Sequence, residues 1–436
     1  MMKARNAFLP AALLAGILVA VACVDHESLL DPPALTAEQE LFSRYVALGN
    51  SITAGFQSGG IVDSTQAEAY PVYLAEAAGV NFGIPALAFP GCPPPLAQPA
   101  PLGAATIAPP GAPACALRAT PTAPFIQNPA VPGARILDVF DNLTQDQGGS
   151  ASTLTSLILG GRTQIEAMHD ADPTLVSVWI GNNDALAAAI AGVPALLTPL
   201  ASFEADLDRL VEEINRTDAR DAILIGVVDA VLAAPLLQPG AYFWAIWQQR
   251  ELLPPEIRGA LKPVSDSCAP AFPDGTPNPL ARNMVSFRIL ADNDFPGITC
   301  NPDELPPGSP HLLTVEEQAA VQGRIAAFNE AIATRAAAEG WIYIDPNQIL
   351  LPLAMEGPPF NRIRKCQMLA TAATPDEFQQ AIALSCPVPP AMGGAPNFFG
   401  SLISFDGVHP TAEAHREVAR VIAAALNERH GLNLQP

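Results

Sequence analysis

The chain has 436 residues, 49% of them hydrophobic, so it is long enough to bury a large core. Its 46 prolines and 31 glycines predict many turns and long irregular connections around that core. The formal net charge is -21 and lysines are scarce, so no basic patch is available to neutralise phosphates, and nucleic acid is excluded as a partner.

The first residues indicate an exported protein. Lys3 and Arg5 supply positive charge, and an apolar run over residues 7–22 follows and ends in small residues. This run is too short to span a membrane comfortably. It therefore predicts a signal peptide at residues 1–22.

The end of that run, Ala20 to Cys23, resembles a bacterial lipobox, with Ala20 where leucine is usual. The resemblance implies cleavage before Cys23 and a lipid on the new N-terminus, which would anchor the protein to a membrane in the periplasm or at the cell surface. An ordinary secretory signal cut nearby is the alternative. Residues 23–40 are expected to form a tether before a single catalytic domain at residues 41–436.

The first half of that domain begins with a strand expected at residues 44–49, where an apolar run stops at a turn. Residues 70–79 have helical spacing and end in glycine, a common helix C-cap. Residues 89–127 are dominated by proline, alanine and glycine, so we expect an irregular insertion that wraps the surface. A helix over residues 133–143 follows, and then a strand over residues 174–180 that ends in Gly-Asn-Asn-Asp.

The second half continues the alternation of strands and helices. Helices are predicted over residues 202–217 and 315–340, and strands over residues 222–228 and 341–345. This pattern is typical of a parallel sheet covered by helices on both faces, whose ligands lie at the carboxyl ends of the strands. The sequence therefore predicts an α/β fold.

Two further insertions interrupt the alternation, near residues 231–310 and 352–400, and neither is expected to be a separate domain. The first contains Phe243, Trp244 and Trp247. These aromatic residues can pack an insertion helix on the core, or they can form a hydrophobic lip that receives an acyl chain.

Six cysteines remain besides Cys23, and an even number suits disulfides in an oxidising compartment. Free buried thiols are the alternative. No CxxC or HxxxH spacing occurs and the histidines are scattered, so no metal site is expected. The cysteines form three sequence-local couples that we expect to be bridged: Cys92–Cys115, Cys268–Cys300 and Cys366–Cys386.

A possible catalytic constellation combines the two ends of the chain. Asp406 and His409 are three residues apart on one turn, where a carboxylate can fix the imidazole tautomer and stabilise the imidazolium. Ser51, after the first strand, would complete a triad. Taken singly, Ser51 could cap a helix, Asp406 could be a turn residue and His409 a solvated surface histidine. Together with the turn at residues 181–184, their common place at strand carboxyl ends favours catalysis.

These segments make the chain resemble the SGNH or GDSL family of serine esterases, lipases and acyl hydrolases. The first block of that family, Gly-Asp-Ser, corresponds to Gly49-Asn50-Ser51, with Asn50 in place of aspartate. The third, Gly-x-Asn-Asp, corresponds to residues 181–184, and the fifth, Asp-x-x-His-Pro, to residues 406–410. The resemblance implies a three-layer α/β/α, flavodoxin-like fold with a central parallel sheet and long loop insertions.

The resemblance also implies a role for each site residue. Ser51 is the nucleophile, His409 the general base and Asp406 the group that orients the imidazole. The oxyanion hole combines the Ser51 N–H, the Asn183 side-chain amide and the N–H of a glycine in the second block.

That glycine has two candidate positions, in the stretch Asn81–Ala86, which contains Gly83, and in the stretch that starts at Asn128. Gly133 in the second stretch lies just before a predicted helix, as the family requires. The equivalent offset from Asn81 is Ala86, so we expect Gly133 to supply the N–H.

The implied function is an exported serine hydrolase that cleaves lipid or other acyl esters through an acyl-enzyme, as a monomer and without a metal or organic cofactor. A carbohydrate O-acetyl esterase with the same triad is the runner-up. A non-catalytic surface-binding lipoprotein is a third interpretation, favoured only by Asn50. An ordinary α/β-hydrolase is disfavoured because Ser51 does not lie in a GxSxG elbow.

Overall fold

The structure is a computed structural model, and it describes residues 34–142, 153–253, 255–306, 308–355, 362–366, 374–387 and 398–436. The chain divides into two compact units, residues 1–37 and 38–436, and the second contains the sheets and nearly all the described helices. The expected signal peptide and Cys23 lie outside the described residues, as does most of the expected tether. Helix α2 (Ala37–Phe42) already begins within the range expected for that tether.

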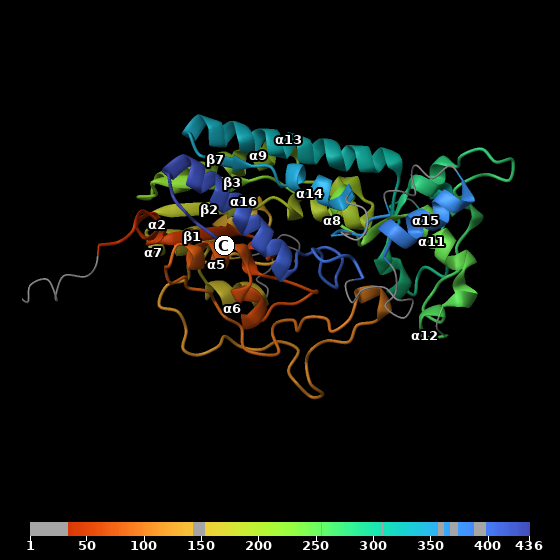
Figure 1. The fold of residues 1–436 in the computed structure, drawn as a ribbon, viewed down its shortest axis with the longest axis horizontal. Helices are drawn as coiled ribbons and strands as arrows, with labels where there is room; N and C mark the ends of the chain where they lie inside the picture. Colours follow the sequence, from red (N-terminus) through yellow and green to blue (C-terminus); the bar gives the residue numbers. More distant parts are fainter. Residues whose placement is uncertain are drawn as a thin grey trace, which may run out of the picture. The chain divides into compact units, whose positions relative to one another are not determined.

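A four-stranded parallel sheet organises the second unit. Its strands are β1 (Tyr45–Gly49), β2 (Leu175–Trp179), β3 (Asp221–Ile225) and β7 (Ile342–Ile344), in the order β1-β2-β3-β7 (Figure 1). Every residue of the first three strands is buried, which explains why they appear in the sequence as continuous apolar runs. Because the strands are parallel, their carboxyl ends all lie at one edge of the sheet.

Helices cover both faces of this sheet, and alternate strand residues point to each face. Val46 and Leu48 pack against one helical layer, whereas Tyr45 and Ala47 pack against the other. The first layer comprises α7 (Gln164–Ala171), α8 (Asn183–Ala191), α9 (Leu200–Asn215) and α13 (Val315–Glu339), and the second comprises α2, α5 (Tyr70–Ala77) and α16 (Ala412–His430). The predicted three-layer α/β fold is confirmed.

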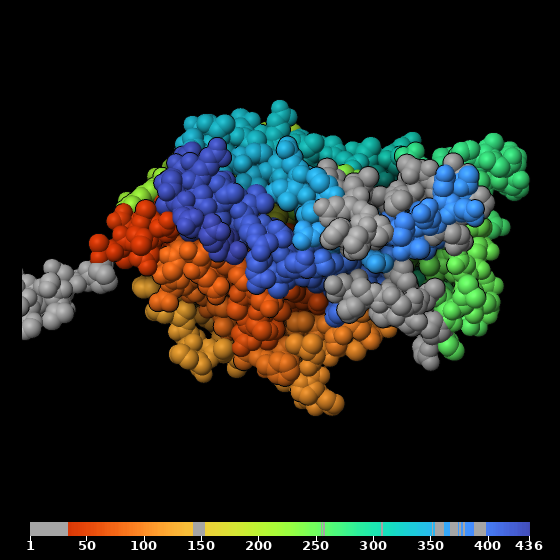
Figure 2. Space-filling view, in the orientation of Figure 1, coloured from red at the N-terminus to blue at the C-terminus, as the bar shows by residue number. Residues whose placement is uncertain are grey.

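The C-terminal helix α16 lies beside α5, near the start of the chain, so segments far apart in sequence are neighbours (Figures 1 and 2). Thr411 caps α16 by accepting a hydrogen bond from the Ala414 N–H at 3.4 Å. This start fixes the preceding turn, which carries residues 406–409, next to the loop after β1. Among the described residues, none of the helices is both long and apolar enough to span a bilayer.

One expected helix is much shorter than predicted. The sequence predicts a helix over residues 133–143, but only the 3₁₀ helix η3 (Ile136–Phe140) forms there. Gly133 has φ +86°, a backbone conformation that a right-handed helix excludes, and Asp141 is extended with φ -135°. The helical stretch is therefore confined to the five residues between.

The insertions differ in how much regular structure they contain. Residues 89–127 hold the single 3₁₀ turn η2 (Ala100–Leu102) and are otherwise irregular, as expected. Residues 231–310 contribute β4 (Leu237–Pro239) and β5 (Met284–Ser286) to a small antiparallel sheet with β6 (Leu312–Leu313) that the sequence did not indicate. Three insertion helices lie together beyond the carboxyl edge of the main sheet: α11 (Gly240–Gln248), α12 (Pro255–Arg258) and α15 (Pro375–Ser385) (Figure 1).

Further helices of the described residues are short or belong to the connections. They are α3 (Ser51–Ala54), α4 (Asp63–Ala67), α6 (Thr153–Leu159), α10 (Ala230–Ala233), α11 (Gly240–Gln248), α12 (Pro255–Arg258), α14 (Pro346–Met355), α15 (Pro375–Ser385), η5 (Pro194–Leu196), η6 (Arg250–Leu252), η7 (Asp266–Cys268), η8 (Pro279–Arg282), η9 (Phe287–Ala291) and η10 (Pro302–Glu304).

Each of the three expected cysteine couples is joined by a disulfide in the structure: Cys92–Cys115, Cys268–Cys300 and Cys366–Cys386. The second and third lie in a separate apolar cluster formed by the insertions. Phe243 is buried in that cluster and its ring contacts the ring of Phe287. Trp244 packs against the same cluster, and Phe243 and Trp247 line a separate apolar cavity. None of these three residues is among the described residues that line the cavities beside Ser51, so the interpretation as a lip over that hydroxyl is not supported.

Candidate active site

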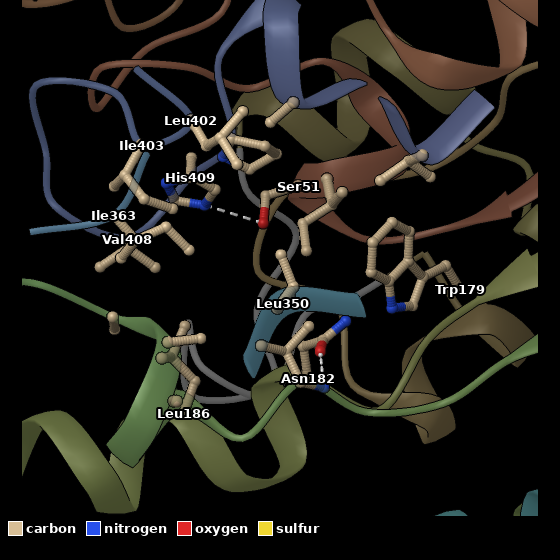
Figure 3. A pocket seen from close by; sticks show the side chains of 18 of the residues that line it. Ser51, Trp179, Asn182, Leu186, Leu350, Ile363, Leu402, Ile403, Val408 and His409 are labelled. Atoms are coloured by element: carbon tan, nitrogen blue, oxygen red, sulfur yellow. Dashed lines mark hydrogen bonds between the residues drawn. The ribbon is translucent and has the colours of Figure 1, made fainter. Parts of the chain in front are cut away.

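Three side chains from opposite ends of the chain meet at the carboxyl edge of the sheet. Ser51 is the first residue of α3 and is separated from β1 by Asn50 alone, while Asp406 and His409 occupy the turn before α16. The Ser51 Oγ lies 2.9 Å from His409 Nε2 (Figure 3). On the other side of the ring, His409 Nδ1 lies 2.8 Å from Asp406 Oδ2. Hydroxyl, imidazole and carboxylate therefore form one continuous hydrogen-bonded row.

The strand-to-helix turn leaves the Ser51 hydroxyl available for His409. Asn50 is the residue that caps α3, because its Oδ1 accepts a hydrogen bond from the Ile52 N–H at 3.1 Å. A side chain at Gly49 would place a Cβ 2.2 Å from Thr53 Oγ1, so the close return of the helix requires glycine there. The interpretation of Ser51 as an ordinary helix cap thus does not fit this structure.

Asp406 is held by four donors. Its Oδ2 accepts the Gly59 N–H at 2.6 Å besides His409 Nδ1, and its Oδ1 accepts the N–H groups of Val408 and His409, both at 2.8 Å. Burial opposes ionisation, but the attraction of His409 and these hydrogen bonds lower the pKa of Asp406 to about 2. An ionised carboxylate keeps the proton of a neutral imidazole on Nδ1, which leaves Nε2 as an acceptor for the Ser51 proton.

The turn that supplies Gly59 also fastens the loop of Asp406 to the loop of Ser51. The Ser58 N–H donates to Ser404 Oγ at 2.8 Å, and the Phe405 N–H donates to Ser58 Oγ at 3.3 Å. Phe56 packs its ring against the His409 ring, with centroids 4.8 Å apart. These contacts hold the loops of Ser51 and Asp406 together and fix the position of the His409 ring between them.

The expected oxyanion donors line one cavity together with Ser51 and His409. Asn183 begins α8, and its Nδ2 donates to the Ala134 carbonyl at 2.9 Å. A side-chain amide carries two hydrogens, so the second N–H can donate to a ligand. Gly133 lines the same cavity, whereas Gly83 does not; the Gly83 N–H donates to Gln127 Oε1 at 2.8 Å.

The loop that carries Gly133 is tied to α8 by a second contact. Asp184 Oδ2 accepts the Ile136 N–H at 3.0 Å, and its Oδ1 accepts the Thr198 hydroxyl at 2.8 Å. Burial raises the pKa of Asp184 to about 7, even though both hydrogen bonds lower it. Asn183 and Asp184 therefore hold this loop beside Ser51 from consecutive positions.

The chain is similar to a known protein family. A family model described as GDSL-like Lipase/Acylhydrolase matches residues 45–422, a span that includes Ser51, Gly133, Asn183, Asp406 and His409. The chain belongs to the GDSL-like lipase/acylhydrolase family. This membership assigns it to the hydrolases that act on esters. Comparison with curated proteins gives no match.

Among solved structures, this GDSL hydrolase is similar to an extracellular lipase from Streptomyces rimosus. The two sequences are 16% identical, and the match covers 87% of this chain and 98% of that chain with a TM-score of 0.32.

Two cavities meet at the Ser51 and His409 side chains of the GDSL hydrolase. One, of about 90 Å³, is lined mainly by aliphatic side chains, and Trp179, Asn182, Asn183 and Glu417 also contribute to its wall. Figure 3 shows several of the aliphatic residues around Ser51: Leu186, Leu350, Ile363, Leu402 and Ile403. The other, of about 670 Å³, also contains Gly133, Asn183, Arg288 and His311 in its lining. The hydroxyl thus lies between an apolar pocket and a more polar cleft.

Sequence reasoning missed two residues of this hydrolase. Gln164 is fully buried and pairs with both backbone groups of Gly49, donating to its carbonyl at 2.9 Å and accepting its N–H at 3.0 Å. No local pattern marks a contact across 115 residues. Arg288 lies in an insertion without a motif, although it is one of few cations in an acidic chain.

Proposed function

We propose that the protein is an exported serine hydrolase that cleaves carboxylic acyl esters through a covalent acyl-enzyme. One observation carries the proposal: the Ser51 Oγ lies 2.9 Å from His409 Nε2, and the other nitrogen of the same ring is hydrogen-bonded to Asp406. A serine hydroxyl paired with an oriented imidazole is the arrangement that activates a nucleophile.

The reaction follows from these groups. His409 Nε2 takes the hydroxyl proton as Ser51 Oγ attacks the ester carbonyl carbon, and Asp406 stabilises the resulting imidazolium. The tetrahedral oxyanion accepts hydrogen bonds from the N–H groups of Ser51 and Gly133 and from Asn183 Nδ2. His409 then gives its proton to the departing alcohol. Water attacks the acyl-enzyme in the same way, which releases the acid and restores Ser51.

The aliphatic pocket suits the acyl chain of the substrate. Its volume is about 90 Å³, whereas a single water needs roughly 10–15 Å³, so several methylene groups fit. Nonpolar walls favour alkyl groups by removing them from water, at about 0.8 kcal/mol per methylene. We therefore propose acyl esters with chains longer than acetate as substrates.

Export is part of the same proposal. Three disulfides support folding in an oxidising compartment, where such bonds persist. We propose that residues 1–22 are removed and that Cys23 carries the lipid that holds the protein at a membrane.

The test is hydrolysis of p-nitrophenyl esters from acetate to decanoate by the wild type, Ser51→Ala and Leu350→Phe. We expect Ser51→Ala to lower kcat by about 10⁴-fold or more. We expect wild-type kcat/KM to peak beyond acetate, and Leu350→Phe, which fills the pocket, to move that peak toward shorter chains. Leu252→Phe is the matched control, because Leu252 is 72% exposed and does not line the pocket.

Two outcomes would contradict the proposal. Equal rates for the wild type and Ser51→Ala would end the assignment as an enzyme and leave the interpretation as a binding lipoprotein. A Ser51-dependent peak at acetate would favour the carbohydrate O-acetyl esterase, whose acyl group needs no aliphatic pocket.

A further inference from the structure

Arg288 places a positive charge in the wall of the active-site cleft. It lines the cavity of about 670 Å³ together with Ser51, Asn183 and His409. Within the described part of the chain, no carboxylate lies at ion-pair distance from its guanidinium, and the hydrogen bond found for Arg288 uses its backbone N–H, which donates to Ser286 Oγ at 3.3 Å. Some of the arginines elsewhere pair with carboxylates, for example Arg335 with Asp208, Nε to Oδ1 2.7 Å.

The backbone that carries Arg288 is firmly held. Its neighbours in η9, Phe287 and Ile289, are 6% and 5% exposed and belong to the apolar cluster of the insertions. The Phe287 ring makes edge contacts with Tyr242 and Phe243, at centroid distances of 5.6 Å and 5.1 Å. The side chain at position 288, between two anchored residues, stays exposed in the cleft. A cation presented from a fixed backbone loses little backbone entropy when it binds a ligand.

The other charged groups of the cleft leave this cation available. The Asp406 carboxylate attracts Arg288, but its oxygens already accept four N–H donors. The His311 ring on the same wall is bonded through Nε2 to Asp292 Oδ2 at 2.8 Å. Because the chain as a whole carries a charge of -21, an anionic ligand entering the cleft needs a local positive group.

We infer that Arg288 binds an oxyanion, a carboxylate or a phosphate, on the alcohol part of the ester substrate. This inference rests on the proposed function, in which the aliphatic pocket takes the acyl chain, so that the alcohol occupies the wider cleft. The planar guanidinium presents paired N–H donors that match two oxygens of either group. Arg288 is a specificity-determining residue that touches the substrate away from the bond that breaks.

The experiment compares butyrate esters whose alcohol part carries an anionic group with neutral counterparts that lack it. One pair is the butyrate of 4-hydroxybenzoate and that of 4-hydroxybenzamide; the other is monobutyryl glycerol phosphate and monobutyryl glycerol. The variants are Arg288→Gln and Arg288→Lys, with Arg282→Gln as the control, since Arg282 is exposed in η8 of the same insertion. Both pairs are measured as kcat/KM at low salt and at high salt.

We expect Arg288→Gln to lower kcat/KM for the anionic esters by about 10-fold or more, mainly through KM, because a hydrogen bond to a charged group is lost. The neutral esters should change less than about two-fold. Arg288→Lys should be intermediate, because it keeps the charge and loses the planar fork. High salt should narrow the difference between charged and neutral esters. The pair with the larger loss identifies carboxylate or phosphate as the natural group.

Equal losses on anionic and neutral esters would overturn the inference and give Arg288 a role in supporting Asp406. Unchanged kcat/KM on both anionic esters would overturn it as well. Failure of the proposed function would look different, as an absence of Ser51-dependent hydrolysis for every ester. Calorimetry can measure binding of the same esters without turnover, in Ser51→Ala and in the double variant that also carries Arg288→Gln. Equal affinities of these two proteins for the anionic esters would contradict the inference.

Discussion

The loops at the carboxyl edge of the main sheet and the insertions that surround them hold their functional side chains in different ways. At the sheet edge, backbone groups do the positioning: Asp406 accepts three backbone N–H groups, and Asn183 donates to the Ala134 carbonyl. In the insertions, side-chain packing and disulfides fix the chain, as around Arg288, whose neighbour Phe287 is buried among aromatic rings.

This difference suggests a division of roles, in which the loops at the sheet edge carry the reacting groups and the insertions carry the groups that select the substrate. Groups that must keep a distance to within a few tenths of an ångström sit on short loops tied to strands, where backbone hydrogen bonds restrict them. Groups that select a substrate come from segments without a repeating pattern, which can change without disturbing the sheet. If the distinction is right, substitutions at the edge should abolish turnover, and substitutions in the insertions should change preference or stability.

The largest effect is expected at the acid of the triad. Asp406→Asn should lower kcat by about 10⁴-fold, because an amide that donates toward Nδ1 stabilises the wrong imidazole tautomer. The measurement is kcat on p-nitrophenyl butyrate, with circular dichroism to confirm folding. KM should change little.

A second His–Asp pair provides the control for Asp406. His430 Nε2 lies 2.8 Å from Asp221 Oδ2, but Asp221 begins β3, at the opposite edge of the sheet from Ser51. Asp221→Asn should therefore cost stability and leave kcat per folded molecule unchanged. If Asp221→Asn lowered kcat as much as Asp406→Asn does, the effect of Asp406→Asn could not be attributed to its contact with the imidazole beside Ser51.

The next effect is expected at the oxyanion donors. Asn183→Ala should lower kcat by about 10²- to 10³-fold with little change in KM, because the lost N–H acts on charge that develops in the transition state. Its neighbour is the matched comparison: the Asn182 carboxamide accepts the Val228 N–H at 2.9 Å. Asn182→Ala should reduce the free energy of unfolding by about 1–3 kcal/mol and keep kcat within about ten-fold. Similar losses of kcat in Asn183→Ala and Asn182→Ala would mean that Asn183 supports the structure of the site and does not donate to the oxyanion.

The sequence allowed the edge loops to be predicted because their information is local. Ser51 lies two positions after the end of an apolar strand, and Asp406 and His409 are three positions apart, so each piece is visible in a short window. The alternation of strands and long helices likewise needs only local periodicity. Ser51 and Asn183 then come together in one cavity because β1 and β2 end at the same edge of the sheet. Asp406 and His409 instead lie on the turn before α16, which follows no strand of the parallel sheet among the described residues, so the expectation that they lie at a strand end is wrong.

What could not be predicted depends on contacts between distant residues. The length of η3 is limited by the backbone conformations of Gly133 and Asp141, and the start of η3 is held by the bond from the Ile136 N–H to Asp184, 48 residues away. The strands of the small antiparallel sheet are too short for periodicity to reveal, and β6 has two residues. The position of Arg288 relative to Ser51 depends on how an irregular insertion packs, which no short-range pattern encodes.

The smallest effect is expected for a buried cation of the insertions. Lys365 is 2% exposed and its Nζ donates to the Ala234 carbonyl at 2.6 Å. Burial lowers its pKa from 10.5 to about 7, although Asp229 raises it. Between pH 7 and pH 10.5 the amine of Lys365 is protonated in the unfolded chain and mostly neutral in the folded chain, so the free energy of unfolding rises with pH over this range. Below about pH 7 the amine is protonated in both states, and the folded protein bears the full cost of burying the charge.

Lys365→Met should therefore increase the free energy of unfolding at pH 7 by about 1 kcal/mol, because a buried charge is replaced by an apolar chain of similar length. The gain should shrink as the pH approaches 10.5, which urea unfolding of both proteins across that range would show. Lys262→Met should do the opposite, since the half-buried Lys262 ammonium donates to the carbonyls of Asp292 and Phe295. If the free energy of unfolding instead varied with pH in the same way for the wild type and Lys365→Met, Lys365 would stay protonated in the folded protein throughout that range. The insertions would then stabilise a buried charge by hydrogen bonds, as the loops at the sheet edge do for Asp406.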